Sequence, residues 1–359
     1  MKIDIKKIIL LSAYLAAADA VNATMINDCN EEHPLEDLKK IFDRVSGQHK
    51  IDCEKNASGA WFYKMSTLKP SENDLGIETK IRLPEIIKDS GRVYHNLSDK
   101  SDYKNGPLDR PSIYLGGKIG GAELDAGLTW DKVHDEKPKE GEEFAFRPFW
   151  RNTEKGINEP TQWHNPPVNS NNKKTNSCPE KKIEPNCSEK NIYFYPKDNI
   201  VMKIEELPIK GNHSESTMKM VIKSQSGDKC FSVCFPQKKN PKAKGNTWKR
   251  VNSIDQFTLG PCYENIDKKG FNKNCRKGNE NKTVLKTKAL SLETQWQEVN
   301  ILNTKRNYPL VPDENVKITV GKEFCDKSTG LKKRDHFRDS SINNKGGQVI
   351  SIFPITPGK

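Results

Sequence analysis

Apolar and polar residues alternate most regularly between residues 122 and 131. The apolar positions of this segment, AELDAGLTWD, are Ala122, Leu124, Ala126, Leu128 and Trp130. The polar positions are Glu123, Asp125, Gly127, Thr129 and Asp131. Because successive side chains of a β-strand point to opposite faces, this period-two pattern predicts a half-buried strand. The preceding LGGKIGG predicts a glycine turn that joins it to another strand.

Shorter alternating or apolar runs recur along the rest of the chain. They span residues 112–115, 143–150, 192–195, 200–207, 217–224, 229–235, 297–302, 316–320 and 349–353. Many short strands separated by Gly, Pro and Asn turns are typical of an antiparallel β-sandwich or jelly roll. The chain is therefore predicted to be mainly β.

The ends and the long polar stretches divide the chain. A lysine-bearing start, an apolar core at 8–17 and small residues before residue 24 predict a signal peptide at 1–23. That core is too short to span a membrane, so no membrane span is expected. Residues 24–60 are predicted to form a brace with a short amphipathic helix in EEHPLEDLKKIFDRVSG. Residues 61–359 are predicted to form one large β-sandwich domain with insertions at 152–190 and 261–283.

Nine cysteines suggest a disulfide-bonded, exported protein with one thiol left over. They are Cys29, Cys53, Cys178, Cys187, Cys230, Cys234, Cys262, Cys275 and Cys325. Sequence-local pairs are expected: Cys29–Cys53, Cys178–Cys187 and Cys262–Cys275, the last two stapling the long loops. Cys230 and Cys234 lie about 13 Å apart on a strand and need other partners, with Cys325 as a candidate. No cysteine or histidine spacing is typical of a metal site, and no metal or cofactor is predicted.

The composition favours a secreted protein with an anionic partner. The net charge is +12, and five Asn-x-Ser/Thr sequons, at Asn56, Asn96, Asn186, Asn212 and Asn281, indicate candidate glycosylation sites. The positive charge favours acidic polysaccharide or another anionic surface polymer. Export excludes intracellular nucleic acid as a partner. Lysines spread over solvated loops are an equally good explanation of the charge.

Glu123 and Asp125 are candidate catalytic residues, because side chains two apart on a strand point the same way. About 5 Å between two carboxylates is the spacing of retaining glycosidases. The motif resembles part of the carboxylate strand of concanavalin A-like glycoside hydrolases, in which Glu-x-Asp precedes a further Glu. Here Gly127 stands at the next same-face position, and Thr129 and Asp131 follow. A solvated strand face therefore explains the pair better than catalysis does.

Aromatic and arginine side chains provide candidate ligand contacts. In FAFRPFWR, Phe144, Phe146 and Trp150 are expected in the core, while Arg147, Phe149 and Arg151 lie opposite. With Trp163 these three are predicted to contact ligand, because sugar rings stack on aromatic rings and arginine forks bind anionic groups. Basic clusters at 238–250 and 332–338 are candidate binding sites for an anionic polymer.

The segments RPSIYLGGKIGGAELDAGLTWDKV, FAFRPFWR and YFYPKDNIVMKI together resemble a family of largely uncharacterised secreted microbial β-sandwich proteins. The resemblance implies one large domain and supplies no catalytic residues. The first functional hypothesis is a secreted, non-catalytic protein that binds carbohydrate or another anionic extracellular surface, as a coat or host-interaction factor. The alternatives are a glycan-active hydrolase or lyase that uses Glu123 and Asp125, and a structural or toxin-like protein that acts through contacts with host or coat proteins.

Overall fold

The computed structural model describes most of the predicted β-domain. The described residues are 59–88, 93–95, 105–107, 109–133, 142–157, 161–166, 186–188, 192–209, 211, 214–256, 289–322 and 336–354. All of them belong to one compact unit, His49–Thr356. The predicted signal peptide, the predicted helix and the insertion at 261–283 lie outside the described residues.

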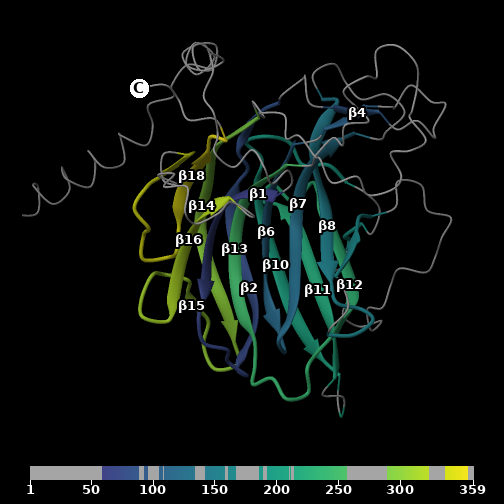
Figure 1. The fold of residues 1–359 in the computed structure, drawn as a ribbon, viewed down its shortest axis with the longest axis vertical. Coiled ribbons are helices and arrows are strands. Elements are labelled where there is room, and N and C mark those ends of the chain that lie inside the picture. The colour runs from purple at the N-terminus through teal and green to yellow at the C-terminus, as the bar shows by residue number, and fades with distance from the viewer. Residues whose placement is uncertain are drawn as a thin grey trace, which may run out of the picture. The chain divides into compact units, whose positions relative to one another are not determined.

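Two large antiparallel sheets make up most of the described part of the chain (Figure 1). In order across the first, seven-stranded sheet come β16 (Val316–Lys322), β1 (Gly59–Thr67), β13 (Thr247–Gln256), β6 (Asp109–Ile119), β7 (Ala122–Lys132), β8 (Phe144–Asn152) and β9 (Gln162–His164). The second, nine-stranded sheet runs β12 (Cys230–Lys238), β11 (Glu215–Ser224), β10 (Asn199–Pro208), β2 (Asp74–Arg82), β14 (Leu290–Asn303), β18 (Gln348–Ile352) and β17 (Phe337–Asp339). Its remaining strands, β15 (Tyr308–Pro309) and β3 (Glu85–Ile87), pair with β14, and β4 (Val93–His95) with β5 (Asn105–Pro107) forms a separate hairpin. The predicted mainly β, antiparallel sandwich is confirmed, and the described residues contain no α-helix.

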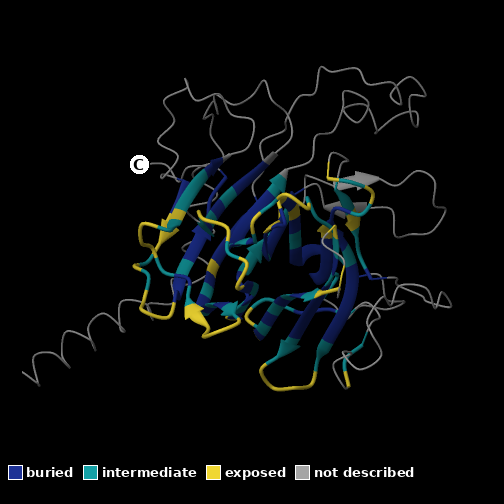
Figure 2. Cartoon of the chain, turned by 90° about the horizontal axis from the view of Figure 1, so that it is seen from below, coloured by how far each residue is buried: buried dark blue, intermediate teal, exposed yellow. Residues whose placement is uncertain are grey.

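The core lies between the two sheets and is formed by the inward-facing residues of both. Alternate residues of β1 and β7 are fully buried, and they belong to one apolar cluster with residues of β10, β11 and β14. Figure 2 shows these buried segments running through the strands of both sheets. The residues of the seven-stranded sheet that point away from this cluster form its outer face, which carries the predicted site.

The hairpin between β6 and β7 is the predicted glycine turn. Ile119 pairs with Ala122 across it. Gly120 and Gly121 have φ angles of 53° and 82°, in the left-handed region that favours glycine. The turn fixes the register of β6 against β7 and therefore sets which residues flank Asp125.

The disulfide pattern differs from the prediction based on sequence proximity. Cys187 is bonded to Cys230 and not to Cys178, with 4.6 Å between the two Cα atoms. The chain around Cys187 runs beside β12, where the amide of Ser188 donates to the Cys230 carbonyl at 2.8 Å. Spatial proximity to β12 therefore decides the pairing. Cys234 is also disulfide-bonded. The other six candidates, Cys29, Cys53, Cys178, Cys262, Cys275 and Cys325, lie outside the described residues.

Arg250 of β13 is a cation in the apolar core, with 1% of its surface exposed. Its guanidinium donates to Gln348 at 2.7 Å and lies 5.0 Å from the ring centre of Trp296. No carboxylate of the described residues forms an ion pair with it. Burial therefore lowers the pKa of Arg250 to about 9.

The lowered pKa of Arg250 predicts a pH-dependent stability. Above pH 9 the unfolded chain holds this proton more tightly than the folded chain does, so stability rises with pH by about 1 kcal/mol per unit. An Arg250→Met variant lacks this contribution. Urea unfolding at pH 9 and pH 10 measures the free energy of unfolding of both proteins. From pH 9 to pH 10, that of wild type should rise relative to that of the variant by about 1 kcal/mol. A pH-independent difference would contradict the effect.

Candidate functional site

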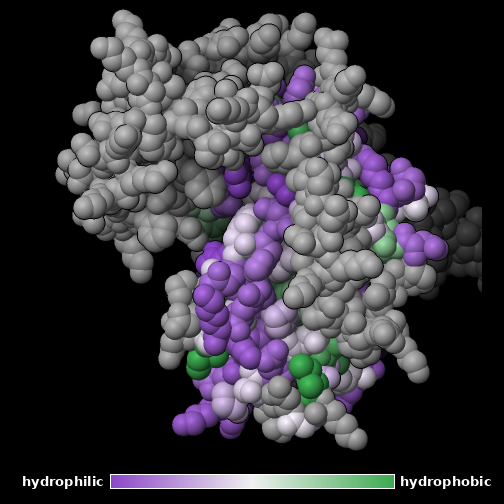
Figure 3. Space-filling model, turned by 90° about the vertical axis from the view of Figure 1, so that its right-hand side faces the viewer, coloured by the Kyte–Doolittle hydropathy of each residue, from purple (hydrophilic) through white to green (hydrophobic). Residues whose placement is uncertain are grey.

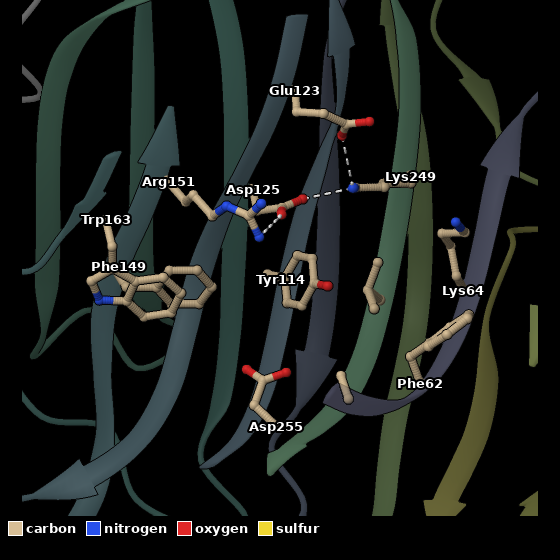
Figure 4. A pocket seen from close by; sticks show the side chains of 12 residues that line it. Phe62, Lys64, Tyr114, Glu123, Asp125, Phe149, Arg151, Trp163, Lys249 and Asp255 are labelled. Atoms are coloured by element: carbon tan, nitrogen blue, oxygen red, sulfur yellow. Dashed lines mark hydrogen bonds and ion pairs between the residues drawn. The ribbon is translucent and has the colours of Figure 1, made fainter. Parts of the chain in front are cut away.

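A groove with a cavity of about 330 Å³ lies on the outer face of the seven-stranded sheet (Figure 4). Five neighbouring strands, from β1 to β8, and the short strand β9 contribute side chains to it. The lining residues are Ala60, Phe62, Lys64, Tyr114, Glu123, Asp125, Phe149, Arg151, Trp163, Lys249, Val251 and Asp255. Glu123 and Asp125, from the polar face of the alternating segment 122–131, therefore point into an aromatic-lined groove.

Four charged side chains form an ion-pair cluster in this groove: Glu123, Asp125, Arg151 and Lys249. The Lys249 Nζ atom lies 2.7 Å from Asp125 Oδ1 and 3.5 Å from Glu123 Oε2. The other oxygen of Asp125 lies 3.8 Å from Arg151. Both carboxylates lean toward Lys249 in Figure 4. Asp125 and Lys249 lie deep in the groove, with side chains 13% and 16% exposed, whereas Glu123 and Arg151 are 47% and 48% exposed.

Gly116 on β6 allows this contact. It pairs with Asp125 on one side and with Lys249 on the other, so it separates the two residues in the sheet. A Cβ atom at Gly116 would lie 2.1 Å from the Leu124 carbonyl oxygen and 3.0 Å from Asp125 Oδ1. The missing side chain leaves the space in which the carboxylate and the ammonium meet.

The charge of Lys249 is fixed by its partners. Burial by itself lowers the pKa of the Lys249 ammonium, but the charges of Asp125 and Glu123 and the hydrogen bonds to them outweigh burial. The pKa is therefore raised above its ordinary value. Lys249 stays protonated at neutral pH and acts as a hydrogen-bond donor and a cation.

A tryptophan platform, Trp163 stacked on Phe149, forms one wall of the groove. The ring centres are 4.3 Å apart and the planes differ by 5°. Trp163 is 42% exposed, whereas Phe149 is 1% exposed. The indole N–H of Trp163 donates to Asn165 at 3.0 Å, so its polar atom already has a partner. What Trp163 offers a ligand is therefore an apolar ring face held in one orientation.

Arg147 is placed differently from the prediction. It is not among the groove-lining residues, and it is 7% exposed. Its guanidinium lies 3.4 Å from Asp131 and donates to the Pro166 carbonyl at 3.2 Å. The segment 161–166 therefore packs against Arg147. We call this segment the arm, because it carries Trp163, and Arg147 braces it.

Five predicted site residues do lie together: Glu123, Asp125, Phe149, Arg151 and Trp163. Phe149 offers a ligand almost no exposed surface, because Trp163 stacks on its ring. Sequence reasoning missed Tyr114, Phe62, Lys64 and Asp255 as site residues, and it named Lys249 only as part of the basic cluster at 238–250. The alternation on their strands places them on the outer face, but only the strand order brings these strands beside β7.

Three lysines of the predicted basic cluster at 238–250 form ion pairs, whereas Arg250 is buried in the core. Lys238 pairs with Glu215, and Lys239 lies 2.6 Å from Glu206. Lys249 pairs with Asp125, as described above. Figure 3 shows one side of the molecule, on which the described surface is mostly hydrophilic with small apolar patches. Lys238, Lys239 and Lys249 are therefore paired charges and not part of a bare cationic surface.

The described part of the chain provides neither a metal-binding cluster nor a membrane-spanning helix. No three His, Cys, Asp or Glu side chains there gather closely enough to hold a metal ion. Within the same residues, no helix has the length and apolar character needed to cross a bilayer.

Comparisons with known proteins give a distant structural likeness. No protein-family model matches the sequence, and the comparison with curated proteins finds no match. Among solved structures, the chain is similar to SCP-B, a member of the eqolisin family of peptidases, in complex with the tripeptide Ala-Ile-His. The TM-score is 0.36 and the identity 8%, over 83% of this chain and 100% of the other. A likeness at this level assigns neither a family nor an activity, so function rests on the groove itself.

Proposed function

We propose that the protein is a secreted, non-catalytic binding protein whose groove takes up an extracellular saccharide. The observation that carries the proposal is the tryptophan platform. Trp163 is exposed on one side, stacked on Phe149 on the other, and its indole N–H is bonded to Asn165. A large, rigid ring beside polar groups suits the flat apolar face of a sugar ring, and preorganisation lowers the entropy lost on binding.

The ion-pair cluster supplies the polar half of such a site. Carboxylates accept hydrogen bonds from sugar hydroxyls, and Lys249 and Arg151 donate to hydroxyl oxygens. Because Lys249 holds Asp125 at 2.7 Å, these groups are oriented before ligand arrives. Fixed polar groups next to an aromatic wall are typical of a small-molecule site.

Export is part of the proposal. The segment 1–23 has the order of features of a signal peptide, and Cys187 is bonded to Cys230. Disulfides persist mainly in oxidising compartments. The proposed ligand is therefore one met outside the cell, such as a wall or surface saccharide.

A glycan hydrolase or lyase is the second candidate, favoured by the presence of Glu123 and Asp125 in one cavity. Against it, both oxygens of Asp125 face cations, at 2.7 and 3.8 Å. That arrangement stabilises a carboxylate and suits neither proton donation nor unhindered nucleophilic attack.

Replacing Trp163 tests the proposed function. Trp163→Ala is expected to weaken saccharide binding about thirtyfold, equivalent to a hot-spot loss of about 2 kcal/mol. Trp163→Phe, which keeps a ring for stacking, should retain most of the affinity. The measurement is a screen on immobilised oligosaccharides followed by calorimetry with the best of them.

Two outcomes would contradict the proposal. The first is a failure of binding to depend on the groove: either wild-type protein binds no oligosaccharide, or Trp163→Ala binds as tightly as wild type. In the second case Trp163→Ala behaves like Leu68→Ala, a control at an exposed residue outside the groove that should leave the affinity unchanged. The second is release of shorter fragments from the bound saccharide. Loss of that release in Glu123→Gln would then support the enzyme instead.

A further inference from the structure

The groove is electrically balanced, although the chain as a whole is strongly basic. Three cationic side chains line it, Lys64, Arg151 and Lys249, and three carboxylates face them, Glu123, Asp125 and Asp255. The net charge of the whole sequence is +12. The excess positive charge of the protein is therefore not concentrated where the ligand is proposed to bind.

Asp125 forms ion pairs with both cations of the ion-pair cluster, Lys249 and Arg151. Lys249 lies on one of its oxygens at 2.7 Å, and Arg151 lies on the other at 3.8 Å. Glu123 adds a second carboxylate, 3.5 Å from Lys249. An anionic group that entered here would have to displace Asp125 from its partners or lie next to two carboxylates.

We propose that Asp125 determines specificity, so that the groove selects uncharged saccharides and rejects acidic ones. This inference rests on the proposed function. A site discriminates by making the wrong ligand unfavourable as well as by fitting the right one, and like charges placed together across an interface repel. A hydroxyl group, in contrast, donates to Asp125 and accepts from Arg151 without disturbing the ion pairs.

Asp125→Asn tests this inference, because the amide is close in shape to the carboxylate and removes one negative charge from between Lys249 and Arg151. Asp255→Asn is the matched control. Asp255 lies at the opposite end of the groove from Glu123 in Figure 4, where it accepts hydrogen bonds from Ser253 and Ser112 at 3.4 and 3.5 Å. Both variants change the charge of the groove by the same amount, and the first removes its charge from between Lys249 and Arg151.

The probes are gluco-, manno- and galacto-oligosaccharides, each compared with the same chain oxidised at C6 to the uronate. Wild-type protein is expected to prefer the neutral member of the pair, with an affinity that varies little with salt. Asp125→Asn should improve binding of the uronate relative to its neutral parent about tenfold, the lower range for a hydrogen bond to a charged group. The gained affinity should fall as salt is added. Asp255→Asn should raise the ratio by less than Asp125→Asn does, because it removes the same charge without freeing Lys249 and Arg151.

Each outcome separates this inference from the proposed function. Wild-type protein that binds no member of any pair contradicts the saccharide function. Binding in which the uronate equals or exceeds its neutral parent leaves that function standing and overturns the role of Asp125. An equal gain in Asp125→Asn and Asp255→Asn also overturns it, because net charge alone would then explain the preference. Unfolding curves of both variants verify that they are folded, and Asp125→Ser provides a second uncharged replacement if the amide variant is not.

Discussion

Replacing Arg147 by methionine is expected to lower the free energy of unfolding by about 3–5 kcal/mol. The change leaves Asp131, which is 5% exposed, buried without its cation. An uncompensated buried charge costs far more than the ion pair contributes. The Arg147→Met substitution also removes the hydrogen bond from Arg147 to the Pro166 carbonyl, so the arm loses an attachment. Urea unfolding of wild type and variant measures the loss.

A double variant, Arg147→Met with Asp131→Leu, is the control for this prediction. Removing both charges together should cost much less than removing the guanidinium alone, since apolar side chains often replace a buried ion pair without loss. Saccharide affinity should fall in both variants, because both free the arm that carries Trp163. If the loss of stability in the double variant equals the sum of the losses in Arg147→Met and Asp131→Leu alone, Asp131 is not the residue whose charge Arg147 compensates.

Gly127→Ala is expected to destabilise the protein by about 3 kcal/mol, at the upper end of the cost of overpacking. A Cβ atom at Gly127 would lie 2.4 Å from the Ile113 carbonyl oxygen and 2.6 Å from the Tyr114 Cα atom. Both are backbone atoms of β6, so β6 and β7 must separate. Phe149 pairs with Gly127 from the other side and lies edge-on to Tyr114 at 5.8 Å. The tryptophan platform on Phe149 should move as well, which weakens saccharide binding.

Gly227→Ala is the control for the steric argument. Gly227 has a φ of 82°, but nothing lies within 4 Å of the position its Cβ atom would take. Its replacement should cost about 1–2 kcal/mol, from backbone strain alone. Thermal unfolding and affinity measurements on both variants distinguish the two effects. If Gly127→Ala costs no more than Gly227→Ala and leaves affinity unchanged, the close approach of β6 to β7 is unimportant.

The alternation in the sequence was sufficient to predict the strand that carries Glu123 and Asp125 and the direction in which they point. Local pattern determines this, because the period of two places all same-parity residues on one face. The partner of Asp125 was not predictable in the same way. Lys249 lies more than a hundred positions along the chain, and its contact depends on the order β13–β6–β7 and on the register that places Gly116 between them.

The differences from the sequence-based expectations concern segments whose path is set by tertiary contacts. Cys178 is near Cys187 in sequence, but Cys187 lies beside β12 and bonds to Cys230. Arg147 is on the outer face, as its parity requires, yet the arm covers it. Periodicity reports which face a side chain takes and gives no information about a loop that later packs on that face.

The excursion after β8 has a consequence for self-association. Lys238 at one end of β12 donates its amide to the Thr153 carbonyl at 2.8 Å, and Ser188 exchanges backbone hydrogen bonds with Cys230 and Ser232 near the other end. β12 is the terminal strand of its sheet, and an uncovered terminal strand is a template for pairing with another chain. Thr153 and Ser188 thus occupy backbone groups that a second molecule would use, and the Cys187–Cys230 bond keeps Ser188 there. Reduction of that bond should therefore promote aggregation through β12.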